Sequence, residues 1–201
     1  MNKRVFYIVF FAGLAVAFYF IIAKVAPGFT EGNLPPIGRV QPFLFTNQNG
    51  KQVSEKDLKD KVVVASYFFT TCRGICPEMN GNMKRVYDHF KNEKDFLILS
   101  HTCDPETDSV PRIKRYADSI GANPDIWIFL TGRKDSLYTM ARLSYAIDDP
   151  ANNLKSIDDD FLHTQYWALV NKKGEVRKIY DGLKNDEVLL LIDDIEKALK
   201  D

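Results

Sequence analysis

Two cysteines stand where an apolar strand passes directly into a helix, and this junction restricts the possible fold more than any other feature. Val62–Phe69 is an apolar run rich in β-branched and aromatic side chains, which is typical of a buried strand. Cys72 and Cys76 follow it, and Pro77 favours a helix that has Cys76 as its N-cap. Apolar side chains then recur at helical spacing as far as Phe90. Because a helix N-terminus favours thiolate over thiol, the junction predicts a reactive cysteine pair.

The residues alone leave more than one interpretation of this pair. A cysteine pair four residues apart spans about 6 Å, which allows either a disulfide or one soft metal ion between Cys72 and Cys76. Two purely structural half-cystines are the simplest alternative. That alternative is disfavoured because a structural disulfide rarely needs a strand-to-helix corner.

The chain begins with an apolar segment that is long enough to cross a membrane. Residues 5–23 contain 19 consecutive positions without a charge. At about 1.5 Å per residue, a helix of this length nearly spans a hydrocarbon core of ~30 Å. Lys3 and Arg4 precede the segment and only Lys24 follows closely, so the positive-inside rule keeps the N-terminus in the cytoplasm. An uncleaved anchor is favoured over a cleaved signal peptide, since no small-x-small cleavage site follows the run.

We expect a membrane anchor at residues 1–24, a linker at 25–37 and one domain at 38–201. The linker is rich in proline and glycine, and the remaining length fits a single domain. The chain has 27 basic and 27 acidic residues and is therefore neutral overall. Because the sequence contains no basic stripe, nucleic acid is not an expected partner.

The order of the expected elements favours an α/β domain with a mixed central sheet. An opening hairpin turns at Asn49-Gly50. The expected segments are then the hairpin 43–53, strand 62–69, helix 77–90, strand 96–99, a helix opening at 104–108, strand 126–130, helix 135–143, hairpin 164–180 and helix 186–200. Alternating strands and helices imply helices on both faces of the sheet. Right-handed crossovers then place Cys72 and Cys76 at the carboxyl end of the central strand.

Three histidines and a third cysteine are the remaining candidates for a metal-binding or redox role. His89 lies among charged neighbours on the helix after the cysteines, and we interpret it as solvent-exposed. His163 precedes a predicted strand, and from its position alone a loop histidine is the simpler interpretation. His101 and Cys103 follow strand 96–99, whose carboxyl end should lie beside the paired thiols. Cys103 is therefore either a small buried residue or an accessory thiol.

Four segments together resemble those of one known family. They are the turn Asn47–Gly50, the corner Phe68–Pro77 with both cysteines, the acidic segment Asp104–Asp108, and His163 before a strand. Over residues 38–200 the chain resembles the Sco (SenC/PrrC-type) copper chaperones. These are thioredoxin-fold proteins that help to assemble the CuA centre of cytochrome c oxidase.

The resemblance implies a thioredoxin-like domain in which Cys72, Cys76 and His163 bind copper as Cu(I), with Cu(II) as a second possible state. The implied partner is the CuA-bearing subunit of cytochrome c oxidase, with other copper chaperones or thioredoxin-like reductants as further partners. The N-terminal helix would cross a bacterial cytoplasmic membrane once and leave the domain on the periplasmic side. Two departures bear on redox behaviour: Arg73-Gly74 replaces the family's Pro-Asp, and Cys103 replaces an apolar residue.

The chemistry of the donor set agrees with this implication. Thiolates select Cu(I) over hard cations and imidazole suits copper, whereas a closed zinc site has four ligands. The rival is an enzyme of the same fold, a thiol–disulfide oxidoreductase or a thiol peroxidase, with Cys72 and Cys76 as its redox pair. Thioredoxin-like reductases usually carry Cys-x-x-Cys, and they typically have a cis-proline before the strand that faces the cysteines. In this chain three residues separate the cysteines and no proline precedes Thr164, which favours metal binding over catalysis. Redox signalling or binding of another metal is the remaining alternative.

Overall fold

The computed structural model describes residues 2–25, 35–148, 162 and 164–201 of the chain. The chain divides into two compact units, Met1–Pro35 and Pro36–Asp201. The first unit contains the helix α1 (Lys3–Val25). Its span Lys3–Lys24 has a mean hydropathy of 2.6 and is long and apolar enough to cross a membrane, a test that a signal sequence near the N-terminus would also pass.

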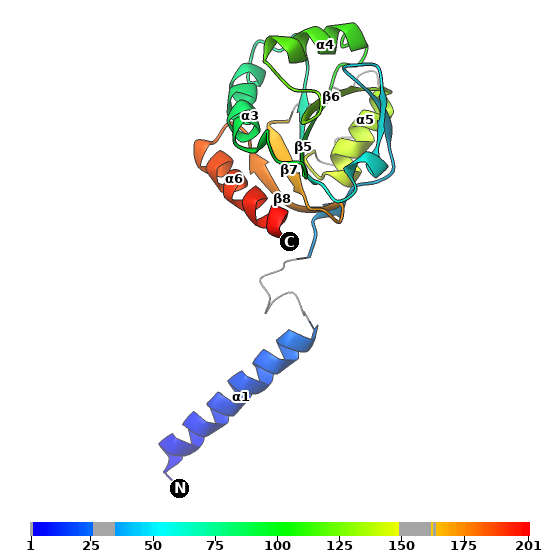
Figure 1. The fold of residues 1–201 in the computed structure, drawn as a ribbon. Helices are drawn as coiled ribbons and strands as arrows, with labels where there is room; N and C mark the ends of the chain where they lie inside the picture. The colour runs from blue at the N-terminus through cyan, green and yellow to red at the C-terminus, as the bar shows by residue number, and fades with distance from the viewer. Residues whose placement is uncertain (1, 26–34, 149–161, 163) are drawn as a thin grey trace. The chain divides into compact units, whose positions relative to one another are not determined.

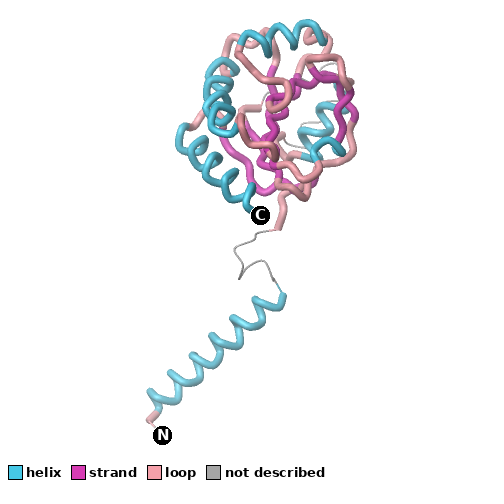
Figure 2. Tube along the Cα trace, viewed as in Figure 1, coloured by secondary structure: helices cyan, strands magenta, loops and turns pink. Residues whose placement is uncertain are grey.

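The second unit is built on one mixed sheet, whose described strands lie in the order β1-β8-β7-β4-β5-β6-β2-β3 (Figures 1 and 2). The strands are β1 (Gly38–Arg39), β2 (Leu44–Asn47), β3 (Gln52–Ser54), β4 (Val62–Phe68), β5 (Phe96–Thr102), β6 (Trp127–Thr131), β7 (Tyr166–Val170) and β8 (Glu175–Asp181). The helices are η1 (Glu55–Leu58), α3 (Cys76–Phe90), α4 (Val110–Ser119), α5 (Lys134–Thr139), η2 (Met140–Ser144) and α6 (Asn185–Lys200).

The centre of the sheet consists of β4 and its two neighbours. β4 runs parallel to β5 and antiparallel to β7, and β5 runs parallel to β6. Every residue of β4 and β5 is buried. Such continuous burial is expected of strands that are covered on both faces, and it explains why their sequences are apolar without alternation.

Helices cover both faces of this sheet, as the sequence predicted. Figure 1 shows α3 and α6 on one side and α5 on the other. On the first side, Met83 of α3 and Leu191 of α6 pack in the same core cluster as Val64 of β4. On the second side, Leu137 of α5 packs in the cluster that contains Ala65 of β4. Alternate side chains of β4 therefore point into two separate cores.

Two helix starts differ from the sequence prediction. Cys76 is not the N-cap of α3 but its first residue, because Ile75 precedes it with helical dihedral angles and accepts the first helical hydrogen bond, from Met79 N–H at 3.0 Å. The acidic segment does not open a helix either. α4 begins at Val110, since the Asp108 carboxylate is engaged by threonines of neighbouring segments and is not free to cap the helix.

The strand ends and one helix also differ in detail. β5 continues through His101 to Thr102, which pairs with Phe68, so it is longer than the predicted 96–99. The helix predicted at 135–143 is observed as α5 followed by a π-helical turn, η2. The opening hairpin is confirmed, with Gly50 at φ 76° in its turn. From its polar composition, segment 148–160 is expected to be a loop, and its residues 149–160 lie outside the described residues.

Candidate metal and redox site

The corner between β4 and α3 places Cys72 and Cys76 together. β4 ends at Phe68, and the Cys72 N–H donates to the Phe69 carbonyl at 3.2 Å, which closes a tight turn. Cys72 is half-buried, whereas Cys76 is 5% exposed in the first turn of α3. Both are free thiols. The carboxyl end of a central parallel strand is where α/β sheets hold ligands, and the prediction from topology placed the pair there.

The two thiols differ sharply in their acidity. Burial opposes ionisation of Cys72, but hydrogen bonds from the Cys76 thiol and from the backbone N–H groups of Cys76, Gly74 and Ile75 outweigh it and lower its pKa. Burial, together with its hydrogen bond to Cys72, raises the pKa of Cys76 to about 12. As pH rises, the reduced pair therefore loses its first proton from the accessible Cys72 and keeps its last proton on the buried Cys76.

This asymmetry predicts which thiol reacts first in the reduced protein. Alkylation requires the thiolate, so Cys72 should react with a midpoint below its ordinary pKa of 9.0, while Cys76 stays protected through neutral pH. Iodoacetamide labelling at a series of pH values, read by peptide mass spectrometry, measures both rates. Cys72→Ser is the control, because it should leave no site labelled rapidly at neutral pH. Faster labelling of Cys76 than of Cys72 would contradict the assignment.

A buried carboxylate holds the turn that carries Cys72. The Asp108 side chain is fully buried and accepts hydrogen bonds from Thr70 N–H at 3.2 Å and from Thr102 Oγ1 at 2.6 Å. The Thr70 hydroxyl also donates to Asp108 and accepts a bond from Arg112 Nε at 2.7 Å. The sequence predicted that the acidic segment opens a helix and matches a family pattern, but its role in fixing the turn was not predicted. The signal available in the sequence was three short polar residues, Thr70, Thr102 and Asp108, which lie at or shortly after the ends of two neighbouring strands.

Cys103 lies beside the corner but on the other side of the sheet. Its N–H donates to the Phe68 carbonyl at 2.8 Å, and its side chain is 3% exposed within the core that contains α5. Burial raises the pKa of Cys103, and negative charge at Cys76, Asp108 and Cys72 raises it further. The pKa of Cys103 therefore depends on the charge of Cys72 and Cys76. Across residues 2–25, 35–148, 162 and 164–201, however, no three His, Cys, Asp or Glu side chains are arranged to hold a metal ion.

His163, the predicted third ligand, lies outside the described residues, whereas both of its sequence neighbours are described. Leu162 is 2% exposed, and its N–H donates to the Tyr138 hydroxyl at 3.2 Å. The Thr164 hydroxyl donates to the Ile147 carbonyl at 2.8 Å. The chain on either side of His163 is therefore attached to the elements that cover the α5 side of the sheet.

The other two histidines are in ordinary structural environments. His89 is exposed on α3, with Nε2 3.0 Å from Glu196 Oε1. His101 is fully buried and its ring stacks on Tyr67 at 5.0 Å between ring centres, with Tyr145 at 5.3 Å. Burial lowers the pKa of His101 to about 4, so it stays neutral at physiological pH.

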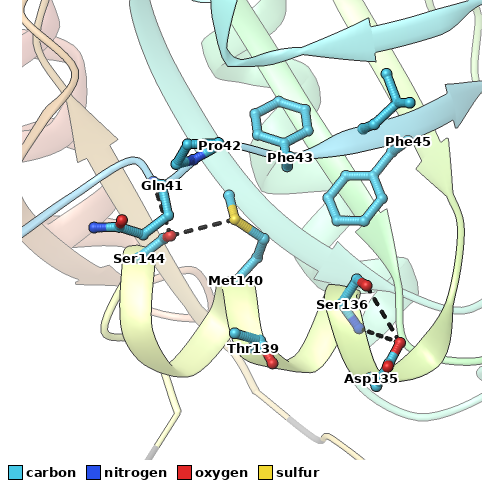
Figure 3. A pocket seen from close by; sticks show the side chains of 10 residues that line it. Gln41, Pro42, Phe43, Phe45, Asp135, Ser136, Thr139, Met140 and Ser144 are labelled. Atoms are coloured by element: carbon cyan, nitrogen blue, oxygen red, sulfur yellow. Dashed lines mark hydrogen bonds between the residues drawn. The ribbon is translucent and has the colours of Figure 1, made fainter.

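The candidate site lies at the surface, since Arg73, Gly74 and Ile75 between the two cysteines are exposed. The cavity in Figure 3, of about 490 Å³, lies between the segment before β2 and the α5–η2 helix, where Ser144 Oγ accepts from Gln41 N–H and donates to Met140 Sδ. A second cavity, of about 500 Å³, lies by Arg39 and the turn between β7 and β8. The described residues that line these cavities include none of the cysteines. An exposed corner suits a group that must be reached by another protein.

Comparison with known proteins gives one consistent result. The SCO1/SenC family model matches residues 35–200. A "SCO1 protein homolog" of Bacillus subtilis is 33% identical over 163 residues, which is 79% of this chain and 82% of the relative.

Solved structures agree with the family match. The structure of BsSco, described as a member of the Sco family of cytochrome c oxidase assembly proteins with a disulfide switch, matches with a TM-score of 0.68 at 33% identity. That match covers 83% of this chain and 96% of BsSco. Copper-bound ScoI of Arabidopsis thaliana matches with a TM-score of 0.63 at 28% identity, over 82% of this chain and 98% of that one.

Proposed function

The chain belongs to the SCO1/SenC family, and on that premise we propose that it is a membrane-anchored copper chaperone for the CuA site of cytochrome c oxidase. It carries copper as Cu(I) between the sulfurs of Cys72 and Cys76 and one imidazole nitrogen of His163. The proposal extends to this chain what the names of its relatives state of them, namely copper binding and cytochrome c oxidase assembly.

The observation that carries the proposal is the pair of hydrogen-bonded thiols at the corner of β4 and α3. Cys72 has a lowered pKa and is accessible, while Cys76 lies behind it with a pKa of about 12. Two thiolates form a soft donor pair, which favours Cu(I) over the hard cations. Among the described residues no three His, Cys, Asp or Glu side chains form a cluster that could hold a metal ion, so the proposal takes its third ligand from outside them. His163 is proposed as this ligand because it precedes a strand, as the copper-binding histidine of the Sco family does.

The same pair gives the chaperone a redox gate. Copper binds the two thiolates only when the cysteines are reduced, and closing a disulfide between Cys72 and Cys76 removes both donors. Both residues are thiols in the described state. When a two-electron oxidant such as the disulfide of another protein accepts the electrons of the two thiolates, the Cys72–Cys76 disulfide closes and copper is released. The disulfide switch named for BsSco is consistent with this gate.

The helix α1 provides the membrane attachment in this proposal. Residues 5–23 of the helix carry no charge, and the positive residues Lys3 and Arg4 form its first two positions. The positive-inside rule keeps that end in the cytoplasm, so the copper-binding unit lies on the periplasmic side of a bacterial inner membrane.

A thiol–disulfide oxidoreductase is the second candidate, and the lowered pKa of Cys72 is the observation that favours it. Such an enzyme would reduce the cysteines of the CuA site before copper arrives. The two functions separate experimentally, because a reductase needs both thiols but has no use for His163. Loss of copper transfer with retained disulfide reduction in His163→Ala would therefore mark the chaperone function.

X-ray absorption on the reduced, copper-loaded protein tests the ligand set directly. We expect one Cu(I) per chain, with two sulfur neighbours and one nitrogen neighbour. His163→Ala should remove the nitrogen and weaken binding, whereas the exposed His89→Ala should change neither quantity. A four-sulfur shell, or full copper retention in His163→Ala, would refute this assignment.

A further inference from the structure

The hydroxyl of Tyr138 joins the two parts of the chain on which the proposed copper ligands lie. Tyr138 belongs to α5 and is 1% exposed. Its hydroxyl donates to the Cys103 carbonyl at 2.7 Å and accepts a hydrogen bond from the Leu162 N–H at 3.2 Å. One buried side chain thus contacts the end of β5 and the residue immediately before His163.

From Cys103 the connection continues to the cysteine corner. The Cys103 N–H donates to the carbonyl of Phe68, the last residue of β4, at 2.8 Å. Cys72 lies four residues further along the chain. The Tyr138 hydroxyl therefore connects Leu162 to Cys103, and the Cys103 N–H connects this residue to the end of β4, four residues before Cys72. The C=O and the N–H of Cys103 belong to different peptide groups, so the connection passes through the covalent backbone of that residue. The two hydrogen bonds of the Tyr138 hydroxyl, one donated and one accepted, polarise one another.

On the other side, both neighbours of His163 in the sequence are attached to the fold. Leu162 is 2% exposed within the core, and the Thr164 hydroxyl donates to the Ile147 carbonyl at 2.8 Å. Successive Cα atoms are about 3.8 Å apart, so anchoring both neighbours limits where a ligand between them can lie. The Tyr138 hydroxyl supplies the anchor on the N-terminal side.

The helix that carries Tyr138 has an irregularity of the kind often found at functional sites. α5 continues into the π-helical turn η2, where the Tyr145 N–H donates to the Met140 carbonyl at 2.9 Å. Arg142 in this turn donates from Nε to Asp148 Oδ2 at 2.7 Å, and its guanidinium lies 5.6 Å from the centre of the Tyr138 ring. The ring is therefore held by packing as well as by its hydroxyl, which gives the hydroxyl a fixed position.

We propose that Tyr138 is a positioning residue for the copper site, which holds the backbone next to His163 at a fixed distance from the Cys72/Cys76 corner. The inference rests on the proposed function, since it takes His163 as a copper ligand. Tyr138 itself does not touch the metal. Its hydroxyl lowers the entropic cost of bringing imidazole and thiolates to one ion.

Tyr138→Phe removes the hydroxyl and keeps the ring. In the full-length reduced chain, Cu(I) affinity should fall roughly tenfold or more, which is the range for outer-shell partners of metal ligands. The nitrogen neighbour in the X-ray absorption spectrum should weaken or disappear. The pH profile of Cys72 alkylation should stay unchanged, because the hydrogen bonds to that thiol come from the α3 corner. Tyr180→Phe is the matched control, since it removes a buried hydroxyl that contacts Asp194 on the α6 side of the sheet.

A double-mutant cycle with His163→Ala decides whether the hydroxyl acts through the histidine. We expect Tyr138→Phe to cause no further loss of affinity once His163 is absent. An equal loss in both backgrounds, or full affinity in Tyr138→Phe while His163→Ala is impaired, would overturn this inference and leave the proposed ligand set intact. Full affinity in His163→Ala would overturn both. Thr164→Val, which removes the second anchor, should reproduce the Tyr138→Phe loss even if the latter variant folds poorly.

Discussion

Cys72→Ser is expected to abolish tight Cu(I) binding, and Cys76→Ser should do the same. Each change removes one of the two soft donors and leaves a hydroxyl, which is a poor ligand for Cu(I). The loss should exceed about 100-fold, the upper range for changes that only touch outer-shell partners. Competition with a Cu(I) chelator of known affinity measures it. The disulfide form of the unmutated chain should fail to bind in the same assay.

The matched control is Cys103→Val. Cys103 is a buried thiol of the same chemistry, but the described residues do not bring it into a three-ligand cluster with the pair. Valine fills a similar volume, so copper binding should be retained, and the redox titration should reduce to one two-electron step. Loss of copper in Cys103→Val, or retention in either serine variant of the pair, would mean that the donors have been assigned wrongly.

The same assay should show a definite pH dependence. Copper binding requires both thiolates, so it displaces the proton that Cys76 holds up to its pKa of about 12. Below the lowered pKa of Cys72 a second proton must leave, and apparent affinity should fall more steeply as pH drops. Because a protonated imidazole cannot bind copper, His163 should add a further fall in affinity toward acid pH, and His163→Ala should remove that last component.

Asp108→Ala is expected to have the largest effect on stability among single changes near the site. The carboxylate is fully buried and satisfies the Thr70 N–H and the Thr102 hydroxyl. Removing it leaves these donors without their charged acceptor in the interior. At about 1–3 kcal/mol for each buried group left unsatisfied, the free energy of unfolding should fall by about 2–6 kcal/mol. Chemical unfolding followed by fluorescence of the buried Trp127 and Trp167 measures this loss.

Asp118→Ala provides the control for Asp108. Asp118 lies on the exposed face of α4 and pairs with Lys114 at 3.2 Å, so its removal should change stability by less than about 0.5 kcal/mol. Asp108→Ala should in addition move the midpoint of Cys72 alkylation toward 9.0, because the Thr70 turn that positions this thiol is released. An unchanged alkylation profile would show that Asp108 supports the fold without organising the thiol.

Local patterns in the sequence were sufficient for the fold class and for the cysteine corner. The apolar run of β4, the Cys-x3-Cys-Pro junction and the spacing of Met79, Met83 and Val86 depend on contacts within a few residues of one another. Strand–helix alternation with right-handed crossovers then placed Cys72 and Cys76 at the carboxyl end of a central strand, and the structure has them there. The N-terminal helix could also be predicted from the sequence, because its length and its lack of charged residues are local properties.

Tertiary structure alone decided the features that depend on residues far apart in the chain. The asymmetry of the thiols arises because Cys76 is packed inside while Cys72 faces backbone N–H groups, and no sequence pattern states which sulfur is covered. Asp108 was predicted to belong to a helix start, but Thr70, 38 residues away, engages its carboxylate. The contact of Tyr138 with Leu162 likewise crosses 24 residues. Such contacts form only when the sheet has brought the strand ends together, since burial and hydrogen bonding act on distance in space.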